Sequence, residues 1–427
     1  MRILLTSNAS HLPPRGGSTR SNLVWLEYLA SRGHACRVVS GALPTDTPDR
    51  RERVRRELED QGIECTESTA PVSVAHRSGV EIDSIPDASR RSAELKRHIQ
   101  EFQPDWVLVS SEDIGQALLR SAHQQAPGHI VYLAHTPQFY PFGPASWNPD
   151  PEAAHLIRRS AAVVAIGHHT AEYIERHLGR QAVVIHPPIY GAGPFERSQN
   201  FQHGLITIIN PCAVKGISIF LALAEKFPDL RFGALPGWGT TSADRNELER
   251  HRNITLLRSC KNIEQILKET RILIAPSLWV EGFGLVVVEA MLRGIPVVAS
   301  DAGGLVEAKL GTHFVIPVRL IQNYEHAFDD QGLPKPQLPQ QDIEPWARAI
   351  HSLVSDRALF ETEAQASQRA ALDFVARLHP ADFEEFLASL TPLGSSDTPS
   401  RLDQLSAQKR ELLLRRLRAG HKASPEG

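Results

Sequence analysis

The sequence contains few cysteines, and none is spaced as in a structural cross-link. Cys36, Cys65, Cys212 and Cys260 are scattered, with no CxxC pair and no histidine at the spacing of a zinc ligand. Disulfide frameworks and zinc knuckles depend on regularly spaced cysteines. The sequence therefore predicts neither, and we expect a reducing, cytoplasmic location.

Long hydrophobic runs are also lacking. No apolar stretch approaches the roughly 18 residues that a membrane-spanning helix requires, and the apolar run near the first residue is too short for the core of a secretory signal. We therefore expect a soluble protein. The sequence leaves open whether the protein touches a membrane surface peripherally.

A strong excess of charge of either sign is missing as well. The 427 residues carry a formal net charge of −3. Such a balance creates no long-range field that would attract nucleic acid. We expect no nucleic-acid partner, and any charged ligand must be bound by local groups.

Short runs rich in Val and Ile alternate with segments of helical apolar spacing in the first half of the chain. One such helix, around Leu23 and Leu26, can end at Gly33 in a left-handed conformation. Strands that alternate with helices predict a parallel sheet covered on both faces. The expected strands are Ile3–Leu5, Cys36–Val39, Trp106–Val109, Ile130–Ala134, Ala162–Ile166 and Ala182–Ile185.

The proline- and glycine-rich stretch Pro187–His203 interrupts this pattern, and a second strand set follows it. Two consecutive α/β halves predict a binding cleft between two domains. The stretch Gln322–Asp342, rich in Gln and Pro, is expected to form a long loop. The expected strands are Leu205–Ile209, Leu230–Leu235, Ile254–Leu257, Ile272–Ala275, Pro296–Ala299 and Phe314–Ile316.

Residues 275–307 are the most informative stretch, because Glu281 and Glu289 stand there eight positions apart. On one continuous helix they would diverge by about 80° and lie about 12 Å apart along the axis. If the helix begins after Gly282 or Gly284, Glu281 lies in the loop at its positive end and Glu289 in its third turn. Both carboxylates can then address different ends of one ligand.

The glycines beside Glu281 let the backbone approach a ligand closely, and free N–H groups at a helix start suit a diphosphate. The alternative is that both glutamates are solvated surface residues. Glu289 argues against it, since it lies inside the apolar run Leu285–Met291, where an unpaired carboxylate is costly to bury.

The segments EGFGLVVVEAM and GIPVVASDAGGLVE resemble the signature of retaining glycosyltransferase family four on the GT-B fold. The resemblance covers most of the chain. It includes an opening strand followed by a Gly-Gly loop, an Asn-Pro-x-x-x-Lys-Gly element, a Pro-Gly-Trp-Gly turn and the paired glutamates. In this order the motifs are highly specific.

The resemblance implies an α/β protein of GT-B type, in which two Rossmann-like domains face each other across a cleft. Residues 1–195 are expected to form the acceptor-side domain and residues 196–375 the nucleotide-sugar donor domain. A helix within residues 376–393 is expected to return to the N-terminal domain. A flexible linker and a short basic amphipathic helix are expected in residues 394–427.

The resemblance further implies a retaining transfer of a sugar from a nucleoside diphosphate sugar to an acceptor hydroxyl. It places Glu289 at the nucleotide ribose and Glu281 near the donor sugar as a catalytic residue. The remaining donor-binding residues implied in this segment are Gly282, Phe283, Gly284 and Leu285.

The segment NPCAVKG, residues 210–216, ends a predicted strand and places Lys215 beside Gly216 at a helix start. A strand end, a tight turn and a lysine are suited to phosphate. In the resemblance this lysine is catalytic, since it offsets charge as the diphosphate departs, and Asn210 and Gly216 bind the donor. Many relatives have Arg where Asn210 stands, so more of the charge stabilisation is expected from Lys215.

The turn PGWG, residues 236–239, resembles the segment that borders the nucleobase, which implies donor contacts for Gly237 and Trp238. Trp238 could equally cover the turn as a hydrophobic residue. Arg258 resembles a position near the base, and a surface salt bridge is the alternative.

In the first half, Gly16 and Gly17 form the loop that the fold places at the donor, although an ordinary turn is the alternative. His135 ends a predicted strand and matches the family histidine near the donor sugar and acceptor. A structural role is the alternative for this histidine. His168 and His169, after another strand, are secondary candidates.

No Asp-x-Asp follows an apolar strand, so we expect a metal-independent reaction with no cofactor besides the nucleotide sugar. A nucleotide-sugar epimerase or hydrolase of the same fold is an alternative function, and a catalytically degenerate binding or scaffold protein is another. Asn210, where many relatives have Arg, is the only sequence feature that supports the degenerate protein.

The acceptor is expected to be a small molecule or a lipid- or carrier-linked group, of a natural product or a glycan. The Pro-rich stretch His135–Asn148 could form an aromatic acceptor pocket or pack as an ordinary loop. Residues 400–419 predict a short basic helix that docks on a partner, on the body or on a membrane, with a disordered tail as the alternative. The aromatic residues of the first stretch are Phe139, Tyr140, Phe142 and Trp147.

Overall fold

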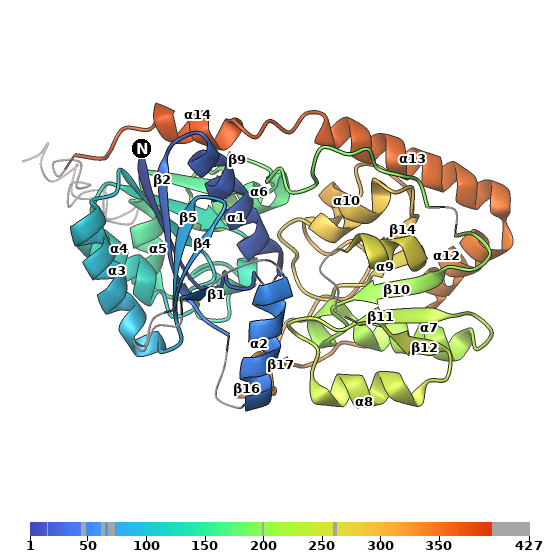
Figure 1. The fold of residues 1–427 in the computed structure, drawn as a ribbon. Helices are drawn as coiled ribbons and strands as arrows, with labels where there is room; N and C mark the ends of the chain where they lie inside the picture. Colours follow the sequence, from blue (N-terminus) through green and yellow to red (C-terminus); the bar gives the residue numbers. More distant parts are fainter. Residues whose placement is uncertain are drawn as a thin grey trace, which may run out of the picture. The chain divides into compact units, whose positions relative to one another are not determined.

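The computed structural model describes residues 1–14, 16–43, 48–60, 65–66, 73–198, 200–258 and 263–394. Residues 1–390 form one compact unit, which contains two α/β halves (Figure 1). The expected basic helix within residues 394–427 lies outside the described residues, apart from Gly394 itself. Within the part of the chain that the structure describes, every helix is too short or too polar to cross a lipid bilayer.

The first half is built on a sheet whose described strands run in the order β3-β4-β5-β2-β1-β6-β7-β8-β9. The strands from β5 to β9 in this order pair in parallel, whereas β3 and β4 add an antiparallel edge. The strands are β1 Arg2–Ser10, β2 Ala35–Gly41, β3 Cys65–Thr66, β4 Ser73–Arg77, β5 Val80–Ile85, β6 Trp106–Ser110, β7 Ile130–Ala134, β8 Ala162–Ala165 and β9 Val183–Val184.

Helices connect these strands, and local capping sets several of their starts. The Asp87 and Asp150 carboxylates accept backbone N–H groups at the starts of the third and fifth helices. Gly33 ends the turn after the first helix with φ +88°, as expected. The helices are α1 Gly16–Ser31, α2 Pro48–Asp60, α3 Ala88–Phe102, α4 Ala117–Gln125, the 3₁₀ turn η1 Pro137–Phe139, α5 Pro151–Arg158 and α6 His168–Leu178.

The second half has a fully parallel sheet with described strands in the order β12-β11-β10-β13-β14-β15. Its strands are β10 Leu205–Ile209, β11 Phe232–Leu235, β12 Ile254–Leu256, β13 Thr270–Ala275, β14 Val297–Ser300 and β15 Val315–Ile316. Its helices are η2 Ala213–Lys215, α7 Ile217–Lys226, α8 Ser242–Arg250, α9 Glu264–Glu269, α10 Leu285–Met291, α11 Leu305–Ala308, α12 Glu344–Ser355 and α13 Arg357–Val375.

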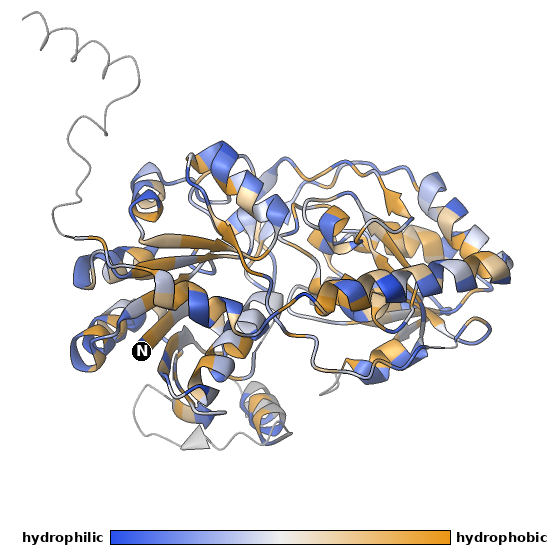
Figure 2. Cartoon of the chain, turned by 90° about the horizontal axis from the view of Figure 1, so that it is seen from above, coloured by the Kyte–Doolittle hydropathy of each residue, from blue (hydrophilic) through white to orange (hydrophobic). Residues whose placement is uncertain are grey.

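The strands of both sheets form the apolar interior, shown in orange in Figure 2, and amphipathic helices cover them. Because parallel strands are buried on both faces, short continuous Val- and Ile-rich runs are sufficient to form them. The two α/β sheets confirm the expected Rossmann-like architecture.

One expected loop is partly wrong. The stretch Gln322–Asp342 contains an antiparallel pair, β16 Tyr324–Phe328 and β17 Pro334–Pro336. Residues of the connecting turn explain the pairing, since the Asp329 carboxylate accepts the N–H groups of Gln331 and Leu333.

The chain returns to the first half after α13. Helix α14, Asp382–Ser389, packs Phe383 on Trp25 of α1 with ring centroids 4.7 Å apart. Glu384 accepts hydrogen bonds from Arg32 and His34, which follow α1. These contacts tie the end of the compact unit to its first helix.

Candidate active site

Lys215 and Glu281 lie at the carboxyl edge of the second sheet. Lys215 ends η2, which follows β10, and Glu281 lies in the loop after β13. Loops at this edge of a parallel sheet are the usual ligand sites of α/β folds. The two residues are 66 positions apart in sequence, and the adjacent strands β10 and β13 bring them together.

Glu281 is held by three side-chain donors. Its Oε1 accepts a hydrogen bond from Lys215 Nζ at 2.5 Å, one from the indole Nε1 of Trp279 at 2.8 Å and one from the Ser277 hydroxyl. Lys215 Nζ also lies 4.6 Å from the centre of the Trp279 ring. The carboxylate is therefore fixed in place, and the ammonium has a cation–π contact besides its ion pair.

A second glycine-rich loop braces the Glu281 backbone. The N–H of Gly304 donates to the Glu281 carbonyl at 2.9 Å. A Cβ on Gly304 would lie 2.3 Å from the Gly282 carbonyl oxygen, so no other residue fits without a shift. The segment of Ala302, Gly303 and Gly304 therefore supports the loop that carries Glu281.

Helix α10 begins at Leu285, after Gly284 with φ +123°. This start agrees with the second of the two expected starts. Glu289 is the fifth residue of the helix and so lies in its second turn, one turn earlier than expected. It is 5% exposed, which excludes a solvated surface position.

Arg20 of α1 pairs with Glu289 from the opposite half, with 2.6 Å between Arg20 Nη2 and Glu289 Oε1. The carboxylate raises the pKa of Arg20 above its ordinary value, although burial opposes the shift. The sequence analysis missed Arg20. The available signal was the single Lys or Arg of α1, placed one turn after Gly16 and Gly17.

Gly16 and Gly17 let the start of α1 approach the second half. A Cβ on Gly17 would lie 2.9 Å from Leu285 Cδ1, and one on Gly16 would lie 3.7 Å from the Trp238 ring. Gly16 also has φ +87°, which favours glycine. The expected Gly-Gly loop therefore lies beside the start of α10 and the PGWG turn.

Asn210 organises the PGWG turn through its side-chain oxygen, while its Nδ2 is buried and has no hydrogen-bond partner among the described residues. Its backbone has φ +58°, and its Oδ1 accepts the N–H of Gly239 at 2.9 Å. A Cβ on Gly237 would lie 2.5 Å from Asn210 Oδ1. A Cβ on Gly216 would lie 1.9 Å from the Pro276 carbonyl, so this glycine permits a close backbone crossing.

Trp238 faces Trp279 with ring centroids 5.9 Å apart, and Lys215 Nζ lies 5.9 Å from the Trp238 ring. The indole therefore belongs to the same cluster as the Lys215–Glu281 pair. Arg258 is exposed directly after β12, and within the described part of the chain it makes no hydrogen bond or ion pair with these residues.

His135 follows β7 and is buried against α1. Its Nε2 lies 2.9 Å from Asn22 Oδ1, and burial lowers the pKa of His135, which keeps the imidazole neutral. The His135 backbone carbonyl faces the second half, because a Cβ on Gly282 would lie 1.9 Å from that oxygen. His135 and the Glu281 loop are therefore neighbours through the backbone.

Phe283 points into an aromatic cluster at the junction of the halves, with its ring stacked on Phe374 at 5.7 Å and edge-on to His186 at 5.0 Å. Its side chain is 2% exposed. The side chain of Phe283 therefore packs between the halves.

His168 and His169 contribute through their backbones. Their N–H groups, at the start of α6, donate to the carboxylate of Glu307 of α11 at 2.9 and 3.0 Å. His186 Nε2 lies 3.1 Å from the same carboxylate. Sequence analysis did not identify Glu307, which closes a contact between the halves.

The aromatic stretch divides into two groups. Tyr140 and Phe142 are buried in the first half, with rings stacked at 5.3 Å. Trp147 instead reaches the second half, where its ring lies 5.9 Å from Trp279 and 5.5 Å from Tyr324. Phe139 contacts Trp147 edge-on at 5.4 Å. Of this stretch, only the aromatic pair of Phe139 and Trp147 thus adjoins the cluster formed by Lys215, Glu281, Trp238 and Trp279.

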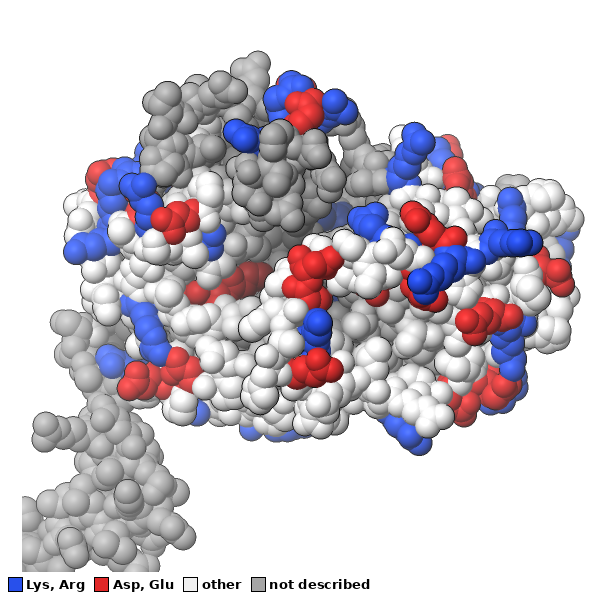
Figure 3. Space-filling view, turned by 90° about the horizontal axis from the view of Figure 1, so that it is seen from below, with Lys and Arg blue, Asp and Glu red and all other residues white. Residues whose placement is uncertain are grey.

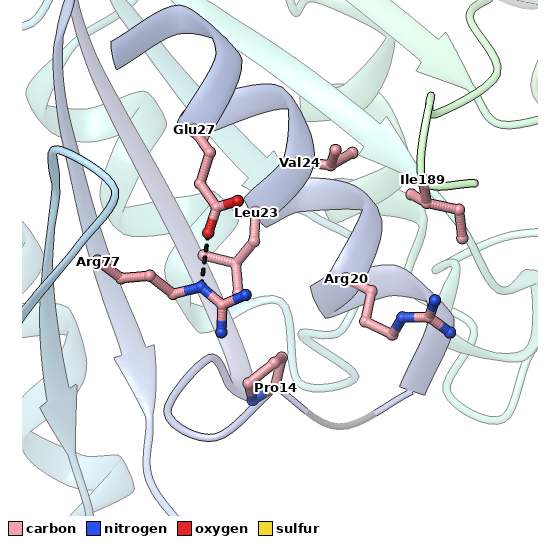
Figure 4. Close-up of a pocket in the computed structure, with 7 residues that line it drawn as sticks. All are labelled: Pro14, Arg20, Leu23, Val24, Glu27, Arg77 and Ile189. Carbon is pink, nitrogen blue, oxygen red and sulfur yellow. Dashed lines mark hydrogen bonds and ion pairs between the residues drawn. The ribbon is translucent and has the colours of Figure 1, made fainter. Parts of the chain in front are cut away.

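A small pocket opens beside Arg20 (Figure 4). An ion pair of Arg77 with Glu27 lies on one side of it and Arg20 on the other.

Among the described residues on the face shown in Figure 3, basic and acidic side chains are interspersed. No group of three His, Cys, Asp or Glu within the described ranges could hold a metal ion.

Comparisons with known proteins agree with this geometry. The family model described as Glycosyltransferase Family 4 matches residues 15–190, and the model described as Glycosyl transferases group 1 matches residues 215–331. An uncharacterized 42.6 kDa protein in the cps region of Klebsiella pneumoniae is 32% identical over 93 residues, which span 22% of this chain and 25% of that protein.

Solved structures share the fold at low sequence identity. Sucrose-phosphate synthase from Thermosynechococcus elongatus is 16% identical, with a TM-score of 0.64 over 91% of this chain and 99% of that chain. HepE from Anabaena, solved with UDP and glucose, is 18% identical, with a TM-score of 0.61 over 91% of this chain and 100% of that chain. The chain therefore contains a Glycosyltransferase Family 4 domain followed by a Glycosyl transferases group 1 domain, and it has the GT-B fold.

Proposed function

We propose that this glycosyltransferase moves a sugar from a nucleoside diphosphate sugar to an acceptor hydroxyl, with retention of the anomeric configuration. The observation that carries the proposal is the Lys215–Glu281 pair at the carboxyl edge of the second sheet, together with the buried Glu289 on the helix that follows the Glu281 loop. A cation suits a diphosphate, and carboxylates suit sugar and ribose hydroxyls.

In the proposed reaction, the acceptor hydroxyl attacks the anomeric carbon from the face that the nucleotide leaves. The bond from this carbon to the diphosphate oxygen breaks as the new glycosidic bond forms, and the departing phosphate takes the acceptor proton. Lys215 offsets the charge on the leaving group. The reaction needs no protein nucleophile, metal ion or cofactor beyond the donor.

Relatives of the same fold support a nucleotide-sugar donor. HepE has been solved with UDP-glucose, at 16% identity and a TM-score of 0.61. The aromatic rings of Trp238 and Trp279 adjoin Lys215 and offer stacking surfaces for a nucleobase or a sugar.

A panel of UDP-, ADP-, GDP- and dTDP-sugars tests the proposal, with donor consumption and product mass measured for each. Transfer should yield the nucleoside diphosphate and a product heavier by one sugar residue, and NMR of its anomeric proton should show the configuration of the donor. Donor loss without acceptor would indicate a hydrolase, and an isomeric donor an epimerase. A protein that consumes no donor would be a binding protein.

The acceptor is proposed to be a small molecule or a lipid- or carrier-linked group. Trp147 supports an acceptor position beside Trp279, because it is the aromatic residue of its stretch that contacts the second half. A docking role for residues 400–419 is proposed from their sequence. Deleting the chain after Gly394 should spare transfer to a free acceptor and impair transfer to a carrier- or membrane-bound one. Equal activity on both acceptor types would contradict the docking role.

A further inference from the structure

Two ion pairs neutralise the site. Lys215 pairs with Glu281 within the second half, and Arg20 pairs with Glu289 between the halves. The two cations and two carboxylates cancel. A nucleoside diphosphate sugar adds a diphosphate with an ionised oxygen on each phosphorus, so Lys215 alone would leave negative charge uncompensated.

Within the part of the chain that the structure describes, two neighbouring groups, Asn210 and Arg293, supply no further cation for a diphosphate. Asn210 is neutral, and its Oδ1 is bound to the Gly239 N–H. Arg293 donates to the backbone carbonyl of Glu289, but its guanidinium pairs with Glu264 at 2.5 Å. Within the described residues, Arg20 is the cation that contacts the Glu289 carboxylate.

The arrangement of two helices places Arg20 beside the donor position. Gly17, next to the start of α1, packs on Leu285, the first residue of α10. Arg20 lies about one turn after Gly17 and Glu289 about one turn after Leu285. Helices α1 and α10 thus lie close together from the contact of Gly17 with Leu285 to the ion pair of Arg20 with Glu289. Arg20 therefore lies about one helical turn from the loop that contains Gly16 and Gly17.

The Arg20 side chain is partly exposed although it is paired with Glu289. Its side chain is 41% exposed, whereas that of Glu289 is 6% exposed. A guanidinium has five N–H donors, and one of its nitrogens, Nη2, contacts Glu289. Figure 4 shows the Arg20 side chain extending from α1 on the opposite side of the pocket from the Arg77–Glu27 pair. Arg20 can therefore rotate while Glu289 stays buried.

We propose that Arg20 is a donor-binding residue that holds Glu289 in the unliganded protein and turns to the diphosphate when a nucleotide sugar binds. Glu289 then accepts hydrogen bonds from the ribose hydroxyls. This inference rests on the proposed function and adds a charged side chain of the first half to donor recognition. A planar guanidinium is suited to this exchange, because it binds carboxylate and phosphate in the same bidentate geometry.

Tyr190, in the stretch Pro187–His203, interacts electrostatically with the same pair. Its hydroxyl is buried and has no hydrogen-bond partner among the described residues. Burial and then the Glu289 carboxylate raise the pKa of Tyr190 well above its ordinary value, so this hydroxyl keeps its proton. A protonated hydroxyl beside Glu289 is a donor that can partly replace Arg20 after the exchange.

Calorimetric titration of the full-length protein with UDP, ADP, GDP and dTDP, and with the corresponding nucleosides, tests the exchange. Arg20→Gln should weaken binding of the preferred diphosphate about ten- to hundredfold, with a change of less than about threefold for its nucleoside. Arg20→Lys should retain part of the diphosphate preference. Glu289→Gln should weaken both ligands together, since it removes the ribose contact.

Arg32→Gln is the matched control, because Arg32 follows the same helix and forms an Arg–Glu pair with Glu384 at its other end. It should bind both ligands as the wild type does. An equal loss of diphosphate and nucleoside affinity in Arg20→Gln would overturn the exchange and leave Arg20 as a residue that only orients Glu289. Wild-type protein that binds none of UDP, ADP, GDP and dTDP would instead overturn the proposed function.

Discussion

Lys215 Nζ donates a 2.5 Å hydrogen bond to Glu281 Oε1, and this bond joins the end of η2 to the loop that precedes α10. The Trp279 indole and the Ser277 hydroxyl donate to the same oxygen. Glu281 can therefore keep two of its three donors when Lys215 moves toward a ligand. The pair is suited to a site that is organised before the donor arrives.

Lys215→Ala should reduce kcat by at least about two orders of magnitude, because one preorganised charge at a leaving group contributes about 3 kcal/mol. The fold should persist, since the ammonium lies at the edge of the sheet. Turnover at saturating donor and the thermal midpoint would be measured together. Lys226→Ala, which removes an exposed pair with Glu344, is the control. Near-native turnover in Lys215→Ala would refute its role.

Glu289→Ala should weaken donor binding by about ten- to hundredfold, because a charged hydrogen bond contributes about 1.5–3 kcal/mol. The effect should appear at limiting donor, in kcat/KM. Since Arg20 would lose its partner, a modest fall in stability should accompany it. Unchanged kcat/KM in a folded variant would remove Glu289 from the site.

Activity should survive chelation. The proposed mechanism uses Lys215 in place of a divalent ion at the diphosphate. Dialysis against EDTA should therefore leave the initial rate within about twofold. Such a change is small, because even a tenfold change corresponds to only about 1.4 kcal/mol. The rate would be compared before dialysis, after dialysis, and after addition of magnesium or manganese. A large loss that either metal restores would contradict the metal-independent mechanism.

Gly282→Ala should disrupt the contact between the Glu281 loop and His135. The added Cβ would lie 1.9 Å from the His135 carbonyl oxygen, so backbone must move. We expect activity to fall more than tenfold, with a lower thermal midpoint. Gly115→Ala is the control, because a Cβ there has no heavy atom within 4 Å. Native activity in Gly282→Ala would show that the two loops separate freely.

Glu307→Gln should lower stability at neutral pH by about 1 kcal/mol, the usual cost of losing a charged helix cap. Burial alone would raise the pKa of Glu307, but hydrogen bonds from His186 and from the N–H groups of His168 and His169 lower it overall. The folded pKa thus lies below the unfolded value. The contribution is present above the ordinary Glu range near 4.3 and is lost as pH falls through the folded pKa.

Urea unfolding of wild-type and Glu307→Gln proteins at several pH values between 7 and 3 would measure this contribution. The difference in the free energy of unfolding should shrink as the pH falls below about 4.3. A difference that stays constant over this range would mean that Glu307 is not ionised in the contact.

Much of the fold follows from local sequence patterns. Buried parallel strands need only short Val- and Ile-rich runs, which is why runs such as Trp106–Val109 and Leu205–Ile209 coincide with β6 and β10. The hairpin at β16 and β17 was missed, because its pairing depends on the turn at Asp329 rather than on an apolar period.

The candidate site likewise has contacts that local sequence patterns predict and contacts that depend on packing. The proximity of Lys215 to Glu281 could be predicted, since parallel strands collect their loops at one edge. The conformations of Asn210 and His135 could not, because both side chains point to partners that only packing brings near: Gly239 for Asn210 and Asn22 for His135.

The sequence by itself determined two α/β halves and made Lys215, Glu281 and Glu289 candidates for the site, because strand period, glycine spacing and residue type are local properties. Only the tertiary structure decided that Arg20 meets Glu289, 269 positions away, and that Glu307 caps α6. Such contacts depend on how the two halves pack against each other, where one hydrophobic cluster runs through both, and no local pattern in either segment encodes that geometry.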